Sequence, residues 1–265
     1  MKIAVSGKGG VGKTTLAAFL VRWFAGRGKQ VLAIDADPDA NLAHGLGAKG
    51  TAGLVPISEM KDLVAERTES LPGSFGGFFK MNPKVDDLPE KLAVNIGEGI
   101  RLMVMGGVKK GGIGCVCPES VLLKNLVQHL ILRRNEVVVM DMEAGIEHLG
   151  RATSKSVDCL IVVVEPGRRS IDTAMRIRDL ASDIGLEGVY LVGNKIRSRV
   201  DQDFLKAALF DFRFLGFIPY DDHLIEADQR GIFPEDMDDR TLAGFREIAQ
   251  GVINRCETAV KPDHP

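Results

Sequence analysis

The segment from Gly7 to Thr14 constrains the fold more than any other part of the chain. It reads Gly-Lys-Gly-Gly-Val-Gly-Lys-Thr, follows the strand-like run 2–6 and opens a helix-like stretch, so it matches the pattern G-x-x-x-x-G-K-[ST] in its usual context. Glycines can adopt positive φ, which lets backbone N–H groups and a helix N-terminus approach phosphate oxygens closely. This context favours a phosphate-binding loop over a merely structural glycine-rich turn. The nucleotide contacts predicted in and after the loop are Gly7, Gly9, Gly10, Val11, Gly12, Lys13, Thr14 and Thr15.

Three side chains carry the predicted phosphate and magnesium chemistry. Lys13 is expected to neutralise the β- and γ-phosphate oxygens, and the Thr14 hydroxyl is expected to bind Mg²⁺. Asp141 ends the apolar run 137–140, where the Walker B carboxylate of such a site belongs. The sequence therefore predicts a nucleotide site that contains Mg²⁺.

An acidic segment follows the second apolar run, over residues 35–41. Ligands of open parallel sheets bind at the carboxyl ends of the strands, so this segment should border the same phosphates. Asp37 is the candidate for orienting the attacking water. The alternative is that Asp37 or Asp39 only caps a helix, because aspartate favours such positions.

The whole chain alternates apolar runs with amphipathic stretches, which predicts an α/β fold with a doubly wound, mostly parallel sheet. No linker or low-complexity tract divides the sequence, so we expect a single P-loop domain over residues 1–265. The stretch 47–100 breaks the rhythm and is expected to be an excursion with one short helix near 58–67. Strands are predicted near 2–6, 30–35, 101–105, 136–141, 158–164, 188–193 and 213–218, and helices near 13–27, 118–134, 168–184, 200–210 and 239–257.

Composition narrows the possible partners. The net charge is −2 and the pI is about 6.2, so the chain lacks the general positive field that non-specific nucleic-acid binding requires. The sequence has no signal-peptide pattern and no apolar run of membrane-spanning length, which predicts a cytoplasmic protein without a membrane partner. In that compartment the four cysteines are expected to be thiols or metal ligands rather than disulfides.

The cysteines fall into two groups. Cys115 and Cys117 form a C-x-C pair at the end of the glycine-rich stretch 106–114, with Pro118 suited to begin a helix. One C-x-C supplies half of the four ligands that a thiolate-bound Zn²⁺ or Ni²⁺ usually takes, and a two-fold symmetric dimer would supply the other half. A loop with two thiols and no metal is the alternative. Cys159 and Cys256 lie in an apolar run and a helix, so both are expected in the core.

The loop 7–14, the segment 35–41 and the strand that ends in Asp141 resemble the MinD, ParA and nitrogenase iron protein superfamily of deviant Walker A ATPases. The resemblance implies ATP as the substrate and a homodimer in which Lys8 acts catalytically by reaching the partner's nucleotide. It also implies that Asn194, at a strand end, contacts adenine; a turn-forming role is the alternative. The guanine-selecting pattern N-K-x-D is absent, because Asn194 and Lys195 are followed by Ile196 and Arg197.

Within that superfamily, the stretches 141–151 and 115–118 resemble the CooC-type accessory ATPases that insert nickel into carbon monoxide dehydrogenase. The resemblance extends over essentially the whole chain. It implies an ATP-dependent dimer that holds Ni²⁺ or Zn²⁺ between Cys115 and Cys117 of both subunits. The implied client is carbon monoxide dehydrogenase or the related acetyl-CoA synthase.

Three alternative hypotheses about the function remain open from the sequence. Four thiolates could instead hold a bridging iron–sulfur cluster for electron transfer or cluster assembly. The chain could be a positioning ATPase that binds membrane or DNA, which its charge disfavours. Finally, the two thiols could have no role in an otherwise ordinary ATPase.

Overall fold

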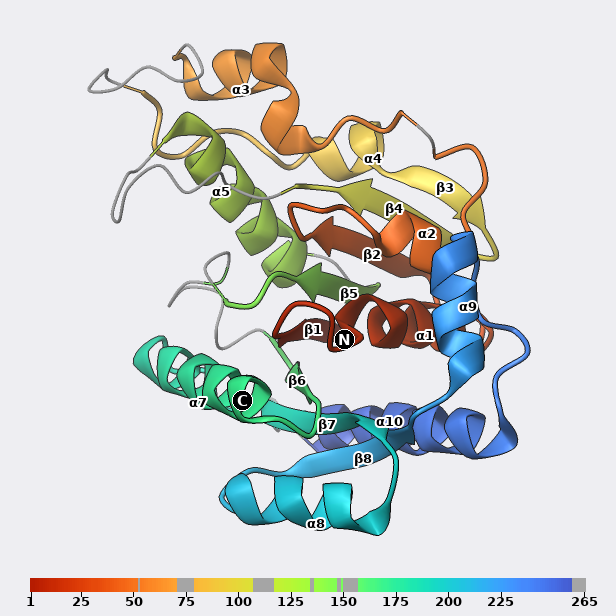
Figure 1. The fold of residues 1–265 in the computed structure, drawn as a ribbon. Coiled ribbons are helices and arrows are strands. Elements are labelled where there is room, and N and C mark those ends of the chain that lie inside the picture. The colour runs from red at the N-terminus through yellow and green to blue at the C-terminus, as the bar shows by residue number, and fades with distance from the viewer. Residues whose placement is uncertain are drawn as a thin grey trace.

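The strands form one eight-stranded sheet. The computed structural model describes residues 1–51, 53–70, 79–106, 117–133, 136–146, 149 and 157–258. Within them the strand order is β3-β4-β2-β5-β1-β6-β7-β8, which Figure 1 shows from top to bottom. The strands are β1 Lys2–Gly7, β2 Val31–Ala36, β3 Val94–Gly97, β4 Ile100–Val104, β5 Val137–Met142, β6 Cys159–Val164, β7 Val189–Ile196 and β8 Phe214–Pro219.

Every described strand pairing is parallel except that of β3 with β4, so the prediction of a doubly wound, mostly parallel sheet is confirmed. Strands β1, β2, β5 and β6 are buried along their full lengths, as continuous apolar runs covered on both faces should be. The register places Asp141 of β5 beside Val5 of β1 and beside Asp35 of β2. The sheet thus brings two carboxylates and the phosphate loop to one edge.

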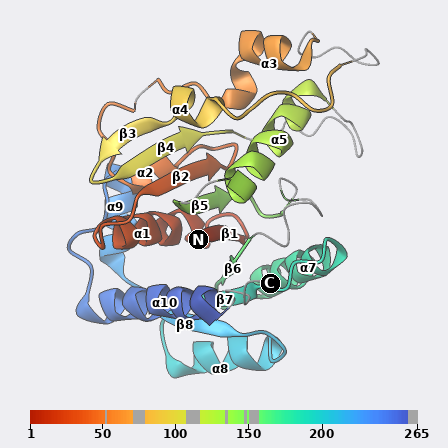
Figure 2. The same ribbon diagram turned by 180° about the vertical axis from the view of Figure 1, so that it is seen from behind.

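Helices cover both faces of the sheet. One hydrophobic cluster packs α1, α2 and α10 against one face, and a second packs α3, α4, α5, α7 and α8 against the other. Figure 2 shows α1 and α10 together on one side and α3 beside α5 on the other. The helices are α1 Lys13–Ala25, α2 Leu42–Gly45, α3 Lys61–Thr68, α4 Leu88–Leu92, α5 Pro118–Arg133, α7 Arg168–Asp183, α8 Arg199–Ala208, α9 Asp222–Arg230 and α10 Asp239–Thr258, with a 3₁₀ turn at Ile57–Glu59.

The seven predicted strands and five long helices are present within a few residues of their predicted positions, and α3 lies near the predicted short helix. The stretch 47–100 is more regular than predicted, because it also contains α4 and β3. Strand β3 has only four residues and returns to β4 through Gly97, Glu98 and Gly99, all with positive φ. So short an edge strand carries too little periodicity to be recognised. The single-domain assignment stays a prediction.

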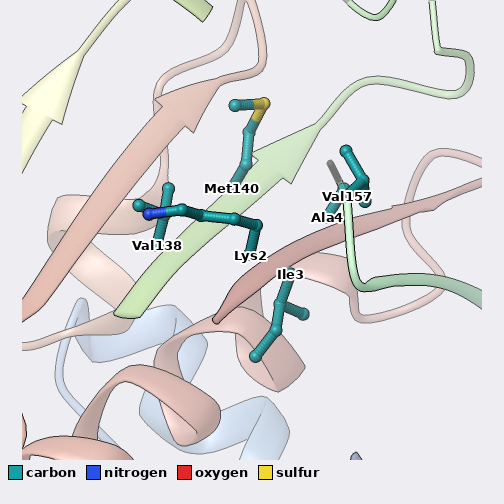
Figure 3. Close-up of a pocket in the computed structure, with 6 residues that line it drawn as sticks. All are labelled: Lys2, Ile3, Ala4, Val138, Met140 and Val157. Carbon is teal, nitrogen blue, oxygen red and sulfur yellow. The ribbon is translucent and has the colours of Figure 1, made fainter. Parts of the chain in front are cut away.

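A small hollow lies between β1 and β5. It has a volume of about 10 Å³ and is lined by the residues in Figure 3: Lys2, Ile3, Ala4, Val138, Met140 and Val157. The Lys2 side chain extends from β1 across β5, and its ammonium donates to the Glu136 carbonyl at 3.2 Å. The space holds about one water molecule, so it is not the nucleotide site. Among the described residues, the helices lack the combination of length and apolar composition that a membrane-spanning helix requires.

Candidate nucleotide-binding site

The phosphate loop joins the end of β1 to the start of α1. Its glycines at positions 7, 10 and 12 have φ of 146°, 76° and 96°. A Cβ at Gly7 would lie 2.5 Å from the Val163 carbonyl oxygen, and one at Gly12 would lie 2.3 Å from the Asn194 amide nitrogen. Both positions therefore require glycine for conformation and for space. The loop forms where the sequence predicts it.

Lys13 lies inside this loop with only 7% of its side chain exposed, and its ammonium is 3.6 Å from an Asp37 carboxylate oxygen. Asp37 therefore provides a negative charge next to the lysine that is expected to bind the β- and γ-phosphates. This position fits the proposed role of Asp37 beside the reacting phosphate. The role itself, orienting the attacking water, stays a prediction.

Thr14 and Asp141, the two residues predicted to hold Mg²⁺, are in contact with each other. The Thr14 hydroxyl donates to one Asp141 oxygen at 2.6 Å, while the other Asp141 oxygen is buried without a hydrogen-bond partner among the described residues. Burial raises the pKa of Asp141 to about 7; the Thr14 hydrogen bond opposes this shift, and the nearby Asp35 charge adds to it. An unpartnered carboxylate oxygen beside a hydroxyl is a suitable donor set for Mg²⁺, a cation that prefers oxygen ligands. Thr14 and Asp141 thus fit the predicted ion.

The cap of α2 comes from Asp35, so the expected alternative of capping by Asp37 or Asp39 is wrong. The two Asp35 carboxylate oxygens accept from the backbone N–H groups of Leu42, at 2.8 Å, and Asp37, at 3.2 Å. Burial raises the pKa of Asp35 to about 6, although both hydrogen bonds oppose the shift. Asp35 fixes the loop that carries Asp37. A charged residue inside a buried strand is the signal that could have identified it.

Asn194 is 5% exposed and braces the phosphate loop from β7. Its side-chain amide donates to the Val11 carbonyl at 2.7 Å, and its side-chain oxygen accepts from the Lys195 backbone N–H at 2.8 Å. The amide keeps a second N–H, so bracing does not prevent contact with a base edge. The adenine contact stays a prediction, and the bracing role was missed from sequence.

Lys8 lies at the mouth of the loop in an ion pair that sequence reasoning missed. Its ammonium is 3.1 Å from one oxygen of Glu165, and the Lys195 ammonium is 3.1 Å from the other. Partial burial raises the pKa of Glu165, but the hydrogen bonds from Lys195 and Lys8 together lower it below its usual value. Within one chain, Glu165 is therefore ionised and paired with the lysine that was predicted to act across a dimer.

Cys117 immediately precedes α5, and Pro118 begins that helix as predicted. The Cys117 sulfur accepts from the Ser120 backbone N–H at 3.4 Å, and burial raises the pKa of the thiol although this hydrogen bond opposes the shift. Cys115 lies outside the described residues. The core positions predicted for Cys159 and Cys256 are confirmed, because these residues are 0% and 8% exposed.

A larger groove, of about 320 Å³, lies between α1 and α9 and includes Arg22, Arg230 and Phe233 in its lining. None of its lining residues belongs to the phosphate loop. A nucleotide would lie instead across the carboxyl edge of the sheet, as ligands of open α/β sheets do.

A mostly parallel sheet with a glycine-rich loop, a buried lysine and a threonine–aspartate pair at its carboxyl edge defines a P-loop nucleotide-binding protein. The family model described as CobQ/CobB/MinD/ParA nucleotide binding domain matches residues 2–234. The chain belongs to this family of ATPases, and its resemblance to the CooC-type branch is confirmed by the relatives below.

The carbon monoxide dehydrogenase accessory protein CooC of Rhodospirillum rubrum is 47% identical over 234 residues, covering 88% of each chain. An ATP-binding protein of Methanocaldococcus jannaschii is 44% identical over 256 residues, covering 96% of this chain and 98% of that protein.

Solved structures show the same fold. The MinD cell division protein of Aquifex aeolicus has a TM-score of 0.60 at 22% identity, covering 100% of this chain and 99% of that one. The septum site-determining protein MinD of Pyrococcus horikoshii, complexed with Mg-ADP, has a TM-score of 0.63 at 19% identity, covering 99% and 98%.

Proposed function

We propose that this ATPase is a metal chaperone that holds nickel between two copies of the chain and delivers it to carbon monoxide dehydrogenase or the related acetyl-CoA synthase. The proposal is supported by the 47% identical relative, which is a carbon monoxide dehydrogenase accessory protein. The observation in this chain that supports the proposal most directly is the position of the Cys117 thiol, immediately before the first turn of α5.

The topology supports a link between this thiol and the nucleotide. Helix α5 connects the parallel strands β4 and β5, so it starts near the carboxyl edge of the sheet and ends near the amino edge (Figure 1). The phosphate loop lies at the same carboxyl edge. A second chain that approaches the nucleotide therefore also approaches the region of Cys117.

In this proposal each residue has a separate task. Lys13 and the loop N–H groups bind the phosphates, and Asp37 orients the attacking water. Thr14 and Asp141 would hold Mg²⁺, which when bound neutralises phosphate charge. Lys8 reaches the nucleotide of the partner subunit, so that ATP becomes part of the interface.

Nickel is the cargo, and four thiolates would bind it: Cys115 and Cys117 of each chain. Delivery requires that nickel affinity differ between nucleotide states, because a ligand that binds two states equally cannot be released by switching between them. ATP binding and hydrolysis would supply this difference by pairing and separating the chains.

The decisive experiment measures molar mass and metal content of the anaerobically purified full chain, with and without ATP. We expect ATP to produce a dimer that binds one nickel ion, a stoichiometry set by four thiolates per site. Cys117→Ser should lose the nickel and keep nucleotide binding, whereas the control Cys256→Ala, which removes a core thiol, should keep both.

A chain that stays single with ATP, or a Cys117→Ser variant that binds nickel like wild type, would contradict the proposal. Iron and sulfide in place of nickel would favour the bridging iron–sulfur cluster. Activation of nickel-free carbon monoxide dehydrogenase or acetyl-CoA synthase by the nickel-loaded chain would identify the client.

A further inference from the structure

Glu165 joins two lysines at the mouth of the phosphate loop. Each of its carboxylate oxygens accepts from a different ammonium, one from Lys8 and one from Lys195, both at 3.1 Å. Glu165 directly follows β6, and its backbone N–H donates to the Ser170 hydroxyl in the first turn of α7 at 3.0 Å. The carboxylate is therefore anchored to the framework of the sheet rather than to the loop.

Lys195 is anchored as well. Its ammonium also donates to the Gly10 carbonyl inside the loop at 2.6 Å. Its backbone has φ of 57° and is held by the Asn194 side chain. A non-glycine residue in the left-handed region is uncommon and persists where its surroundings fix it. Lys195 is thus a fixed bridge between the loop and Glu165.

Lys8 is held less firmly. Among the described residues its ammonium contacts the Glu165 carboxylate, and 36% of the side chain is exposed. Exposed ion pairs are weak, with a typical strength of about 0–1 kcal/mol, so a group with more negative charge can displace such a partner. A triphosphate is such a group.

We infer that Glu165 is a positioning residue that retains Lys8 on its own chain until a second copy presents a nucleotide, and that this contact must break before Lys8 crosses the interface. The inference rests on the proposed ATP-dependent pairing of two chains. Its basis is competition between two anions for one cation. The Lys8 ammonium, 3.1 Å from Glu165 of its own chain, must leave this carboxylate before it can bind a phosphate of the partner's nucleotide. The contact therefore raises the concentration at which two chains pair.

The test is analytical ultracentrifugation of the full chain with Mg²⁺ and a non-hydrolysable ATP analogue. Glu165→Gln keeps the side-chain shape and removes the charge, so it should dimerise at a roughly two- to fivefold lower protein concentration than wild type. Glu165→Asp retains the carboxylate and should return toward the wild-type value. Glu187→Gln, which makes the same charge change at an exposed residue before β7, should behave as wild type.

The Lys8→Ala background shows whether Glu165 acts through Lys8. There the Glu165→Gln change should have no further effect, because the retained group is gone. Steady-state ATP turnover gives a second readout. Glu165→Gln should lower the protein concentration that gives half-maximal activity, while the KM for ATP stays within about twofold of the wild-type value. A purely structural defect would instead change ATP binding and therefore the KM.

Two results overturn the inference while the proposed pairing survives. They are a Glu165→Gln variant that dimerises at the wild-type concentration or above, and an effect of the same size without Lys8. A wild-type chain that never dimerises with the analogue would overturn both the inference and the pairing.

Discussion

At the scale of single residues, buried carboxylates set the electrostatics of the nucleotide site. Asp35 and Asp141 are both fully buried, and the Asp35 charge adds to the effect of burial in raising the pKa of Asp141. Lys13 opposes this effect at Asp141, and a bound magnesium ion would oppose it further. A cation bound beside Asp141 would therefore favour the ionised carboxylate.

Replacing Asp141 by Asn should separate stability from ligand binding. The pKa of Asp141 is raised from 3.8 to about 7 in the folded state. Between these two values the native state keeps the proton while the unfolded state loses it. The contribution of Asp141 to the free energy of unfolding therefore falls as pH rises from about 4 to about 7. At pH 8 without ligand, Asp141→Asn should therefore be at least as stable as wild type.

With Mg·ATP at about 100 times its dissociation constant, wild type should gain about 2.7 kcal/mol and Asp141→Asn at least about 1.4 kcal/mol less. Thermal unfolding with and without ligand measures both quantities. Asp39→Asn, an exposed change in the neighbouring loop, is the control. An equal gain in the variant would reject Asp141 as a magnesium residue.

Asn194 offers a test of base contact against loop bracing. We expect Asn194→Ala to weaken binding of inorganic triphosphate about tenfold, because the buried Val11 carbonyl loses its donor, and to weaken ATP binding further, because adenine loses a partner. Isothermal titration with both ligands measures the two losses, with Asn254→Ala on the exposed face of α10 as the control. Equal losses for ATP and triphosphate would limit Asn194 to bracing.

At the scale of elements, the stretch between β2 and β4 is held by contacts among short helices rather than by sheet pairing alone. Arg67 of α3 binds both carboxylate oxygens of Asp87, which precedes α4, at 2.9 and 2.8 Å. Lys91 of α4 adds a 2.7 Å contact to the same carboxylate. These charge-assisted bonds connect α3 to α4 in addition to the apolar contacts of both helices with the core.

Replacing Asp87 by Asn should reveal this connection through pH. The hydrogen bonds from Arg67 and then Lys91 lower the pKa of Asp87 well below 3.8, so its stabilisation is present above pH 4 and is lost as pH falls through the folded pKa. We expect a cost of about 1 kcal/mol at pH 7 that shrinks below pH 4.

Urea unfolding of wild type and variant across this pH range measures the difference. Asp86→Asn is the matched control, because the neighbouring Asp86 is 56% exposed and its contact with Lys84 is long, at 3.9 Å. A difference that is constant between pH 7 and pH 3 would show that the Asp87 charge is not its source.

At the scale of the whole molecule, the sheet order makes the two lysines of one loop different. Because β1 lies between β5 and β6, Lys13 faces the Asp37 and Asp141 side of the site, whereas Lys8 faces Glu165 beyond β6. Their exposed fractions, 7% and 36%, follow from this placement. This placement agrees with the proposal that Lys13 binds the chain's own phosphates while Lys8 reaches the nucleotide of a second chain.

Local sequence patterns predicted the features that a few neighbouring residues encode. The glycine positions of the phosphate loop, the seven main strands, the core cysteines Cys159 and Cys256, and the start of α5 at Pro118 were all predicted. Each depends on a local requirement: a permitted φ, a continuous apolar run, or a proline at the first helical position.

Contacts between side chains that are distant in sequence could not be predicted from such patterns and became known from the fold. Lys8 and Glu165 are 157 residues apart, and Asn194 and Val11 are 183 residues apart. The capping by Asp35 and the bracing by Asn194 likewise depend on what the sheet places opposite these residues. Such pairs leave no local pattern, because strand order and register, rather than neighbouring residues, set the distances between them.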